Sequence, residues 1–137
     1  MTKEFINPPE LFCSMPFGFS QVIACNGGRT VYISGQTAWD KDRQLVGGTS
    51  LPAQTRQALT NLQTAVRSAG GELSDIVSIR IYVVGSDSNA VASIGDIFRE
   101  FFPGDKPPTS TWLGVSSLAV RDFLIEIEAV AVIDDLN

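Results

Sequence analysis

The sequence predicts an α+β fold in which one mixed β-sheet carries two helices on one face. Two observations lead to this expectation. Short runs rich in β-branched residues are separated by two longer segments whose apolar residues recur at helical spacing. Strands that alternate with amphipathic helices are typical of a single sheet whose connections cross over one face. The 137 residues, 44% of them hydrophobic, are enough for one domain over residues 1–137.

The first half of the sheet is expected to begin with a hairpin. Residues 21–24 and 29–34 read as two strands, and the Asn26-Gly27-Gly28 segment between them is a turn signal. A short additional strand is expected over residues 4–6.

Capping residues and the helical spacing of apolar residues predict two helices. The first is expected to begin near Ser50, with Pro52 in its first turn, and to end before Gly70. Its apolar stripe consists of Leu51, Ala58, Leu59, Leu62, Ala65, Val66 and Ala69. The second helix is expected to start at an N-cap residue, Ser88, and to close at Pro103-Gly104. Its inward residues are expected to be Val91, Ile94, Phe98 and Phe101.

Three more strands are expected over residues 75–84, 109–116 and 123–133. Alternation along the last one divides its side chains between two faces. Ile125, Ile127, Ala129, Ala131 and Ile133 point one way, and Glu126, Glu128, Val130 and Val132 point the other. The first set suits a core covered by helices. The second leaves a largely apolar face that predicts an oligomer.

Composition excludes several kinds of chemistry. The chain has no histidine, which removes Ser-His-Asp and Cys-His nucleophiles and histidine-based zinc sites. We expect no metal and no cofactor. A net charge of −5 and scattered basic residues argue against nucleic acid as a partner. No apolar run approaches the ~20 residues of a membrane span, and the N-terminus has no signal-peptide layout, so we expect no membrane association and a cytoplasmic location. Cys13 and Cys25 are expected to be reduced thiols, with no assigned role.

Several motifs in order resemble the Rid (YjgF/YER057c/UK114) family. They are GFSQVIA, VYISGQTAWD, AQTRQALTNLQTAVRSAG, DIVSIRIYVV, FREFFP, the Pro107-Pro108 pair and LIEIEAVAV, and together they cover about residues 19–133. The resemblance implies a chorismate-mutase-like fold and a homotrimer with small-molecule sites between subunits. It also implies hydrolysis of reactive enamines and imines, such as 2-aminoacrylate.

The resemblance assigns roles to the glutamates of the last strand. Glu126 matches the carboxylate that holds the attacking water, and a partly buried glutamate can act as a general acid or base. Glu128 is expected to be a supporting polar group. The alternative is that both glutamates pair with an interface arginine such as Arg80.

Three positions depart from the pattern of active deaminases. An arginine that clamps the substrate carboxylate is replaced by Ser110, a site tyrosine by Phe19, and an asparagine by Gly95. Ser34 and Gly35 remain. The chain therefore resembles an arginine-less branch of the family, and we expect a poor 2-aminoacrylate deaminase that prefers a neutral or differently charged ligand.

Further candidates lie around the expected cleft. Thr109 and Ser110 offer hydroxyl groups, and Trp112 is either an aromatic wall or interface packing. Ser34 and Gly35 either approach the ligand or serve turn geometry. Trp39, after the SGQ motif, is a weaker wall candidate.

Three function classes remain open at this point. The first is a hydrolase of imines or enamines that uses Glu126 and a water, and the second is a non-catalytic trimer that binds a small metabolite. The third is the endoribonuclease or translation-inhibitor activity under which relatives are sometimes described. The acidic composition and the missing histidine argue against the third.

Overall fold

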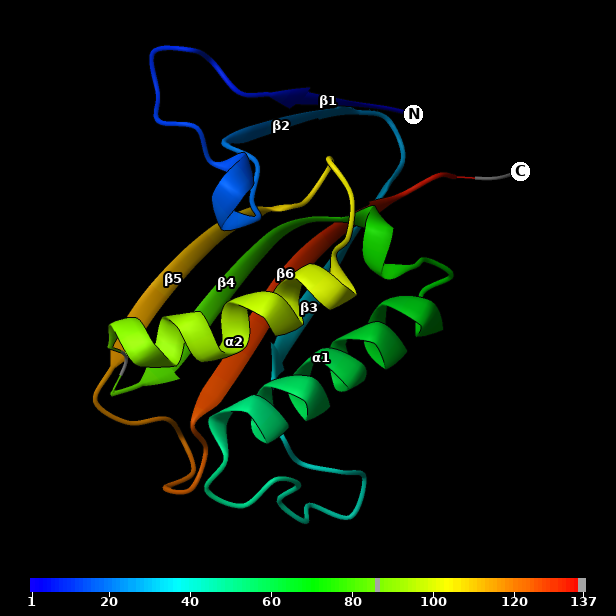
Figure 1. The fold of residues 1–137 in the computed structure, drawn as a ribbon. Helices are drawn as coiled ribbons and strands as arrows, with labels where there is room; N and C mark the ends of the chain where they lie inside the picture. Colours follow the sequence, from blue (N-terminus) through cyan, green and yellow to red (C-terminus); the bar gives the residue numbers. More distant parts are fainter. Residues whose placement is uncertain (86, 136–137) are drawn as a thin grey trace.

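The computed structural model describes residues 1–85 and 87–135. Its main sheet has four strands in the order β3-β6-β4-β5, with β6 antiparallel to both neighbours and β4 parallel to β5. Both helices lie on one face of this sheet, as Figure 1 shows. The mixed sheet with two helices on one face is therefore as predicted. The elements are β3 (Arg29–Gln36), α1 (Leu51–Ser68), β4 (Ile76–Val84), α2 (Ser88–Phe101), β5 (Thr109–Val115) and β6 (Ile125–Ile133).

Local signals set the helix ends. The Ser50 hydroxyl accepts a hydrogen bond from the Ala53 amide at 3.2 Å, as expected for an N-cap. For α2 the predicted cap is one residue out: Asp87 accepts from the Ala90 amide at 2.8 Å, and Ser88 is the first helical residue. Aspartate and serine side chains can both cap a helix, and here the Asp87 carboxylate occupies the N-cap position.

The core lies between the helices and the sheet. The inward residues of β6 are all buried, as the alternation predicts, and they meet the buried stripe of α1. On α2 the buried residues are Ile94 and Ile97. Val91, predicted to point inward, is 41% exposed because it stands at the rim of a cavity under the first turns of α2.

The predicted hairpin of the first half is wrong. Strand β2 (Val22–Asn26) pairs with β1 (Thr2–Ile6) in a separate two-stranded ribbon, and β3 pairs only with β6. The reason lies just before β2. The Ser20 amide donates to the Pro108 carbonyl at 3.1 Å and its hydroxyl donates to the Pro107 carbonyl at 2.6 Å. These bonds hold the start of β2 at the β5 edge, opposite the β3 edge.

The ribbon therefore crosses the end of the sheet, as Figure 1 shows. Five extended residues span about 16 Å, close to the ~14 Å of three interstrand spacings. Gly27 and Gly28, both with positive φ (78° and 79°), then turn the chain into β3. The ribbon is tied down by an ion pair between Lys3 and Asp75 at 3.7 Å.

The face of the sheet away from the helices, called here the open face, is less apolar than predicted. Val132 is buried, but Tyr32 on β3 is 81% exposed, and β4 contributes Arg80 and Tyr82 beside the glutamates. On β6 alone this face is largely apolar, but the neighbouring strands bring polar groups to it. None of the helices in the described part of the chain is long and apolar enough to span a membrane.

Candidate functional site

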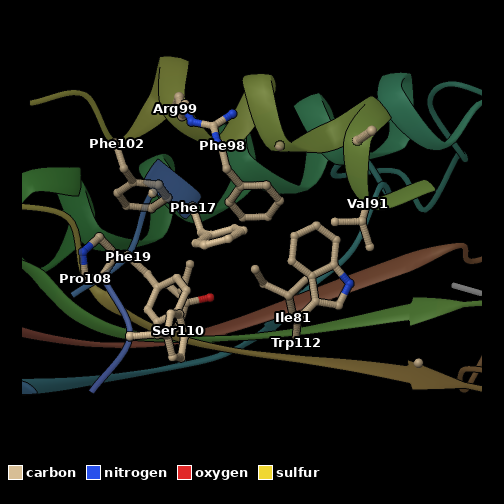
Figure 2. A pocket seen from close by; sticks show the side chains of 16 residues that line it. Phe17, Phe19, Ile81, Val91, Phe98, Arg99, Phe102, Pro108, Ser110 and Trp112 are labelled. Atoms are coloured by element: carbon tan, nitrogen blue, oxygen red, sulfur yellow. The ribbon is translucent and has the colours of Figure 1, made fainter. Parts of the chain in front are cut away.

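A cavity of about 760 Å³ lies between α2 and strands β4 and β5, and residues 12–19 close one end of it. We call it the α2–β5 cavity. Figure 2 shows aromatic rings from the N-terminal segment, the helix and the sheet pointing into it. Its aromatic lining consists of Phe12, Phe17, Phe19, Phe98, Phe102 and Trp112. An apolar cavity of this size with a few polar groups is typical of a small-molecule site.

The floor of the cavity follows from strand alternation on β5. Ser110 and Trp112 point toward the helices, and Figure 2 shows the Ser110 hydroxyl directed into the cavity. Thr109 and Thr111 consequently belong to the open face. The Thr109 hydroxyl donates to the Val77 carbonyl at 3.0 Å.

The roof of the cavity is one face of α2. Gly95, Phe98, Arg99 and Phe102 recur at i, i+3, i+4 and i+7, the spacing of neighbours on a helix. Because Gly95 has no side chain, space remains beside it. A Cβ built at Gly95 has Arg99 Nη1 as its nearest described neighbour, at 3.6 Å.

The end wall is built by the 3₁₀ turn Met15–Phe17 and its flanks. The Ser14 hydroxyl donates to the Phe19 carbonyl at 2.6 Å, and Gly18 closes the turn with φ 82°. The Phe12 ring meets the rings of Phe17 and Phe19 edge to face, at centroid distances of 6.0 and 5.9 Å. Together with the Ser20 bonds to the Pro107 and Pro108 carbonyls just before β5, these contacts fix Phe19 in the cavity.

Among the described residues, the polar side-chain groups of this cavity are the Ser110 hydroxyl and the Arg99 guanidinium. The indole N–H of Trp112 is buried and has no hydrogen-bond partner among the described residues. The Arg99 guanidinium donates to Asp96 Oδ1 at 3.0 Å and to the Pro16 carbonyl at 2.8 Å.

A second group of predicted residues gathers on the open face. The register of β3 against β6 shifts between Ile33 and Gln36, which is a β-bulge at Ser34-Gly35. The Glu126 carboxylate lies directly over Gly35, where an added Cβ would collide with it. We call Ser34, Gly35 and Glu126 the open-face cluster.

Glu128 has a different partner. It accepts a hydrogen bond from the Tyr82 hydroxyl, and it lies directly opposite Arg80 in the pairing of β6 with β4. The hydrogen bond to Glu128 raises the pKa of Tyr82, and desolvation adds to the rise. Among the described residues, no ion pair joins Arg80 to Glu126 or Glu128.

The predicted site residues therefore form two groups on opposite faces of one sheet. Phe19, Ser110 and Trp112 line the α2–β5 cavity. Ser34, Gly35 and Glu126 form the open-face cluster, and Thr109 shares that face. Trp39 belongs to neither group, since its ring packs on Phe123 at 4.9 Å.

Sequence reasoning missed much of the cavity lining. Phe12, Phe17 and Arg99 were not among the candidates, and Phe98 was expected only in the core. A sequence signal was present, because Phe12 and Phe17 are large aromatic residues in a segment without strand or helix periodicity. In the structure these two side chains are 62% and 68% exposed. Exposed aromatic residues clustered in a loop are typical of a binding surface.

Comparison with known proteins identifies the family. The family model described as Endoribonuclease L-PSP matches residues 15–133. The chain belongs to this family, the Rid family. Among curated Rid relatives, a 2-iminobutanoate/2-iminopropanoate deaminase of Dermatophagoides farinae is 32% identical over 134 residues, which is 96% of this chain and 98% of that protein. A RutC family protein of Pyrococcus horikoshii is 36% identical over 118 residues, 85% of this chain and 88% of that protein.

Solved structures of Rid proteins differ in their TM-score and sequence identity to this chain. YyfB from Yersinia pestis, a Rid protein described as of unknown function, is 41% identical with a TM-score of 0.92, covering 97% of this chain and 100% of its own. YyfA from the same organism is 29% identical, with a TM-score of 0.69 over 96% of this chain and 100% of its own. RidA from an Antarctic Psychrobacter is 29% identical, with a TM-score of 0.68 over 83% of this chain and 87% of its own.

Proposed function

We propose that this chain binds a small reactive metabolite in a cleft between two subunits and hydrolyses its imine or enamine group. The α2–β5 cavity of one subunit would provide the binding walls, and the open-face cluster of a neighbour would provide Glu126. The observation that carries the proposal is the placement of the two residue groups on opposite faces of one sheet. A single copy does not bring them together, whereas two copies packed cavity to open face can do so.

The chemistry requires little beyond a positioned carboxylate. Glu126 accepts a proton from a water as the water oxygen adds to the carbon of the C=N bond. The proton passes to the nitrogen and gives a carbinolamine. Glu126 then takes the hydroxyl proton of the carbinolamine and delivers it to the amino group as the C–N bond breaks, so that ammonia leaves and a carbonyl compound remains. An enamine enters the same route after it is protonated on carbon to the imine. The name of the deaminase relative from Dermatophagoides farinae supports this reaction class.

The cavity lining narrows the substrate. An arginine at position 110 would bind a carboxylate with two charge-assisted bonds of roughly 1.5–3 kcal/mol each, and Ser110 makes no such pair. We therefore expect slow turnover of 2-aminoacrylate. Phe19 and Gly95 likewise replace a tyrosine and an asparagine of active deaminases. The loss of these polar groups favours a second candidate function, a non-catalytic trimer that binds its metabolite in this cleft.

The test compares imine hydrolysis by the wild type and by Glu126→Gln. Imines are generated from a panel of amino acids by an amino-acid oxidase with catalase, and the release of ammonia is followed. Wild-type acceleration of at least one imine should fall to the background rate in Glu126→Gln, while the oligomer stays intact. Glu4→Gln, the same change on the exposed side of β1, is the control and should retain activity.

Two results would contradict the proposal. Full activity in Glu126→Gln would remove this carboxylate from the reaction. Ligand binding by the wild type without acceleration of any imine would favour the non-catalytic candidate.

A further inference from the structure

The α2–β5 cavity contains a cation that the family resemblance does not assign. Arg99 stands one helical turn after Gly95 and lines the cavity roof (Figure 2). Its side chain passes close to Gly18 as well: a Cβ built at Gly18 would lie 3.6 Å from Arg99 Cγ and 3.7 Å from Nε. Two residues without side chains therefore flank this arginine. A longer side chain at either position would extend into the space that the guanidinium uses.

The guanidinium keeps donors to spare. It carries five N–H groups, and its hydrogen bonds to Asp96 and to the Pro16 carbonyl engage two of its three nitrogens. The Asp96 side chain is 88% exposed, so water screens its charge. The Arg99 side chain is itself 49% exposed, and its remaining N–H groups have no hydrogen-bond partner among the described residues.

The remaining walls suit an aromatic group. The ring of Phe98 is tilted by 49° against that of Trp112, at a centroid distance of 5.9 Å, and the N-terminal rings meet edge to face. These tilted and edge-on contacts cover only part of the ring surface, so the remaining ring faces can pack against a planar ligand. A volume of about 760 Å³ also lies within the range of pockets for larger organic ligands, well beyond the needs of an imino acid with six heavy atoms.

We propose that the α2–β5 cavity binds aromatic carboxylates, with the ring among the phenylalanines and Trp112 and the carboxylate on Arg99. The proposal rests on the function proposed above, because it names the ligand class of that cleft. It places the anionic group of the ligand at the helix roof, away from the sheet floor where Ser110 lies. An aromatic imino acid would then be the preferred substrate class, in place of the neutral or differently charged ligand expected from the missing arginine at position 110.

The experiment uses Trp112 as its own reporter. The chain has two tryptophans, so Trp39→Phe leaves Trp112 as the only one. Fluorescence titrations in this background compare 3-phenylpropanoate with 3-phenylpropanamide, which has the same ring and chain but no charge. We expect the carboxylate to bind at least tenfold more tightly than the amide, and Arg99→Gln to reduce its affinity to that of the amide.

Two further variants separate recognition from structure. Arg56→Gln removes an arginine that is also paired with a carboxylate, Glu100, but lies on α1 outside the cavity, and it should change neither affinity. Arg99→Lys keeps the charge without the planar fork and should give an intermediate affinity for the carboxylate.

Three results would overturn the proposal. The first is equal affinity of the wild type for acid and amide. The second is an equal loss of both affinities in Arg99→Gln, because this would show that Arg99 acts only by holding the Pro16 carbonyl. The third is the absence of any Trp112 response at millimolar ligand.

Failure of this proposal differs from failure of the proposed function. Arg99-dependent binding without hydrolysis of any imine would leave the ligand class standing and remove the reaction. Equal hydrolysis of aromatic and aliphatic imines by the wild type and Arg99→Gln would leave the reaction standing and remove the ligand class.

Discussion

Glu126 and Glu128 lie two residues apart on the same face of β6, yet their surroundings differ. Glu126 lies over Gly35 with no described hydrogen-bond donor fixed to it, whereas Glu128 accepts from the Tyr82 hydroxyl. A carboxylate that is already engaged is a poor acceptor for a water proton. If Glu126 is the catalytic carboxylate, as proposed, its unengaged oxygens suit that role better than those of Glu128.

The Tyr82–Glu128 hydrogen bond predicts a pH effect that can be measured directly. A tyrosine with a raised pKa contributes stability below its ordinary pKa of ~10, and this contribution is lost as the pH rises through the raised value. Ultraviolet titration of the two tyrosines should therefore show one phenol that ionises above the other. Glu128→Gln should lower that pKa, and Tyr82→Phe should remove the high-pH step.

The exposed tyrosine is the matched control. Tyr32→Phe should leave the high-pH step in place, because Tyr32 is 81% exposed. A high-pH step that survives in Tyr82→Phe would contradict the assignment.

At the scale of elements, the bulge in β3 is what brings the open-face cluster together. It places Gly35 beneath the Glu126 carboxylate, an approach that no residue with a Cβ can make without displacement. The glycine of the SGQ motif is thus explained by a steric contact with the last strand, although the motif and that strand are about 90 residues apart in the sequence.

Gly35→Ala should destabilise the fold by roughly 1–3 kcal/mol, because the new methyl group overpacks the contact with Glu126. Combining it with Glu126→Ala should recover most of the loss, since the second change removes the colliding carboxylate. Urea unfolding of the wild type, both single variants and the double variant measures the coupling.

Gly95→Ala is a control that should raise the free energy of unfolding instead of lowering it. Its new Cβ meets only Arg99 at an ordinary contact distance, and alanine is the better helix former by roughly 0.5–1 kcal/mol. Strict additivity of the Gly35 and Glu126 changes would show that the two residues do not touch.

Most elements could be predicted from the sequence because their signals are local. Three such signals are the N-cap at Ser50, the alternation along β6 and the end of α1 before Gly70. Each depends only on residues a few positions apart. The partner of β2 could not be predicted in this way. Asn26-Gly27-Gly28 does form a turn, but Ser20 fixes the other end of β2 to the β5 edge, almost 90 residues further along the chain.

The same distinction applies to the candidate site. Motif residues such as Glu126, Ser110 and Phe19 were predicted as a group, and the structure divides them between the two faces of the sheet. Arg99 and the rings of residues 12–17 escaped prediction because only the folded chain brings them under α2.

At the scale of the whole molecule, the proposed function requires assembly, because the two groups of site residues lie on opposite faces of the sheet. The open face carries exposed Tyr32 and Leu113 next to the glutamates, and a face of this kind suits contact with another subunit. Light scattering coupled to size exclusion should give about three times the chain mass of 14.7 kDa. A monomer at micromolar concentration would exclude the shared cleft.

Tyr32→Glu adds a third carboxylate to this face and should weaken the assembly and abolish imine hydrolysis together. Tyr32→Phe keeps the ring and should preserve both. An intact trimer that retains full activity in Tyr32→Glu would place the subunit contact elsewhere.

The aromatic end wall of the α2–β5 cavity has a thermodynamic consequence, because it belongs to the beginning of the chain. Residues 12–19 are held by the Ser20 bonds to the Pro107 and Pro108 carbonyls and by the Arg99 bond to the Pro16 carbonyl. Local detachment of such a segment needs less free energy than global unfolding. The apparent dissociation constant is then the intrinsic one divided by the fraction of molecules whose chain start is docked. By the same linkage, a ligand bound in the cavity as proposed would raise that fraction, and it would anchor the first residues of the protein as much as they enclose it.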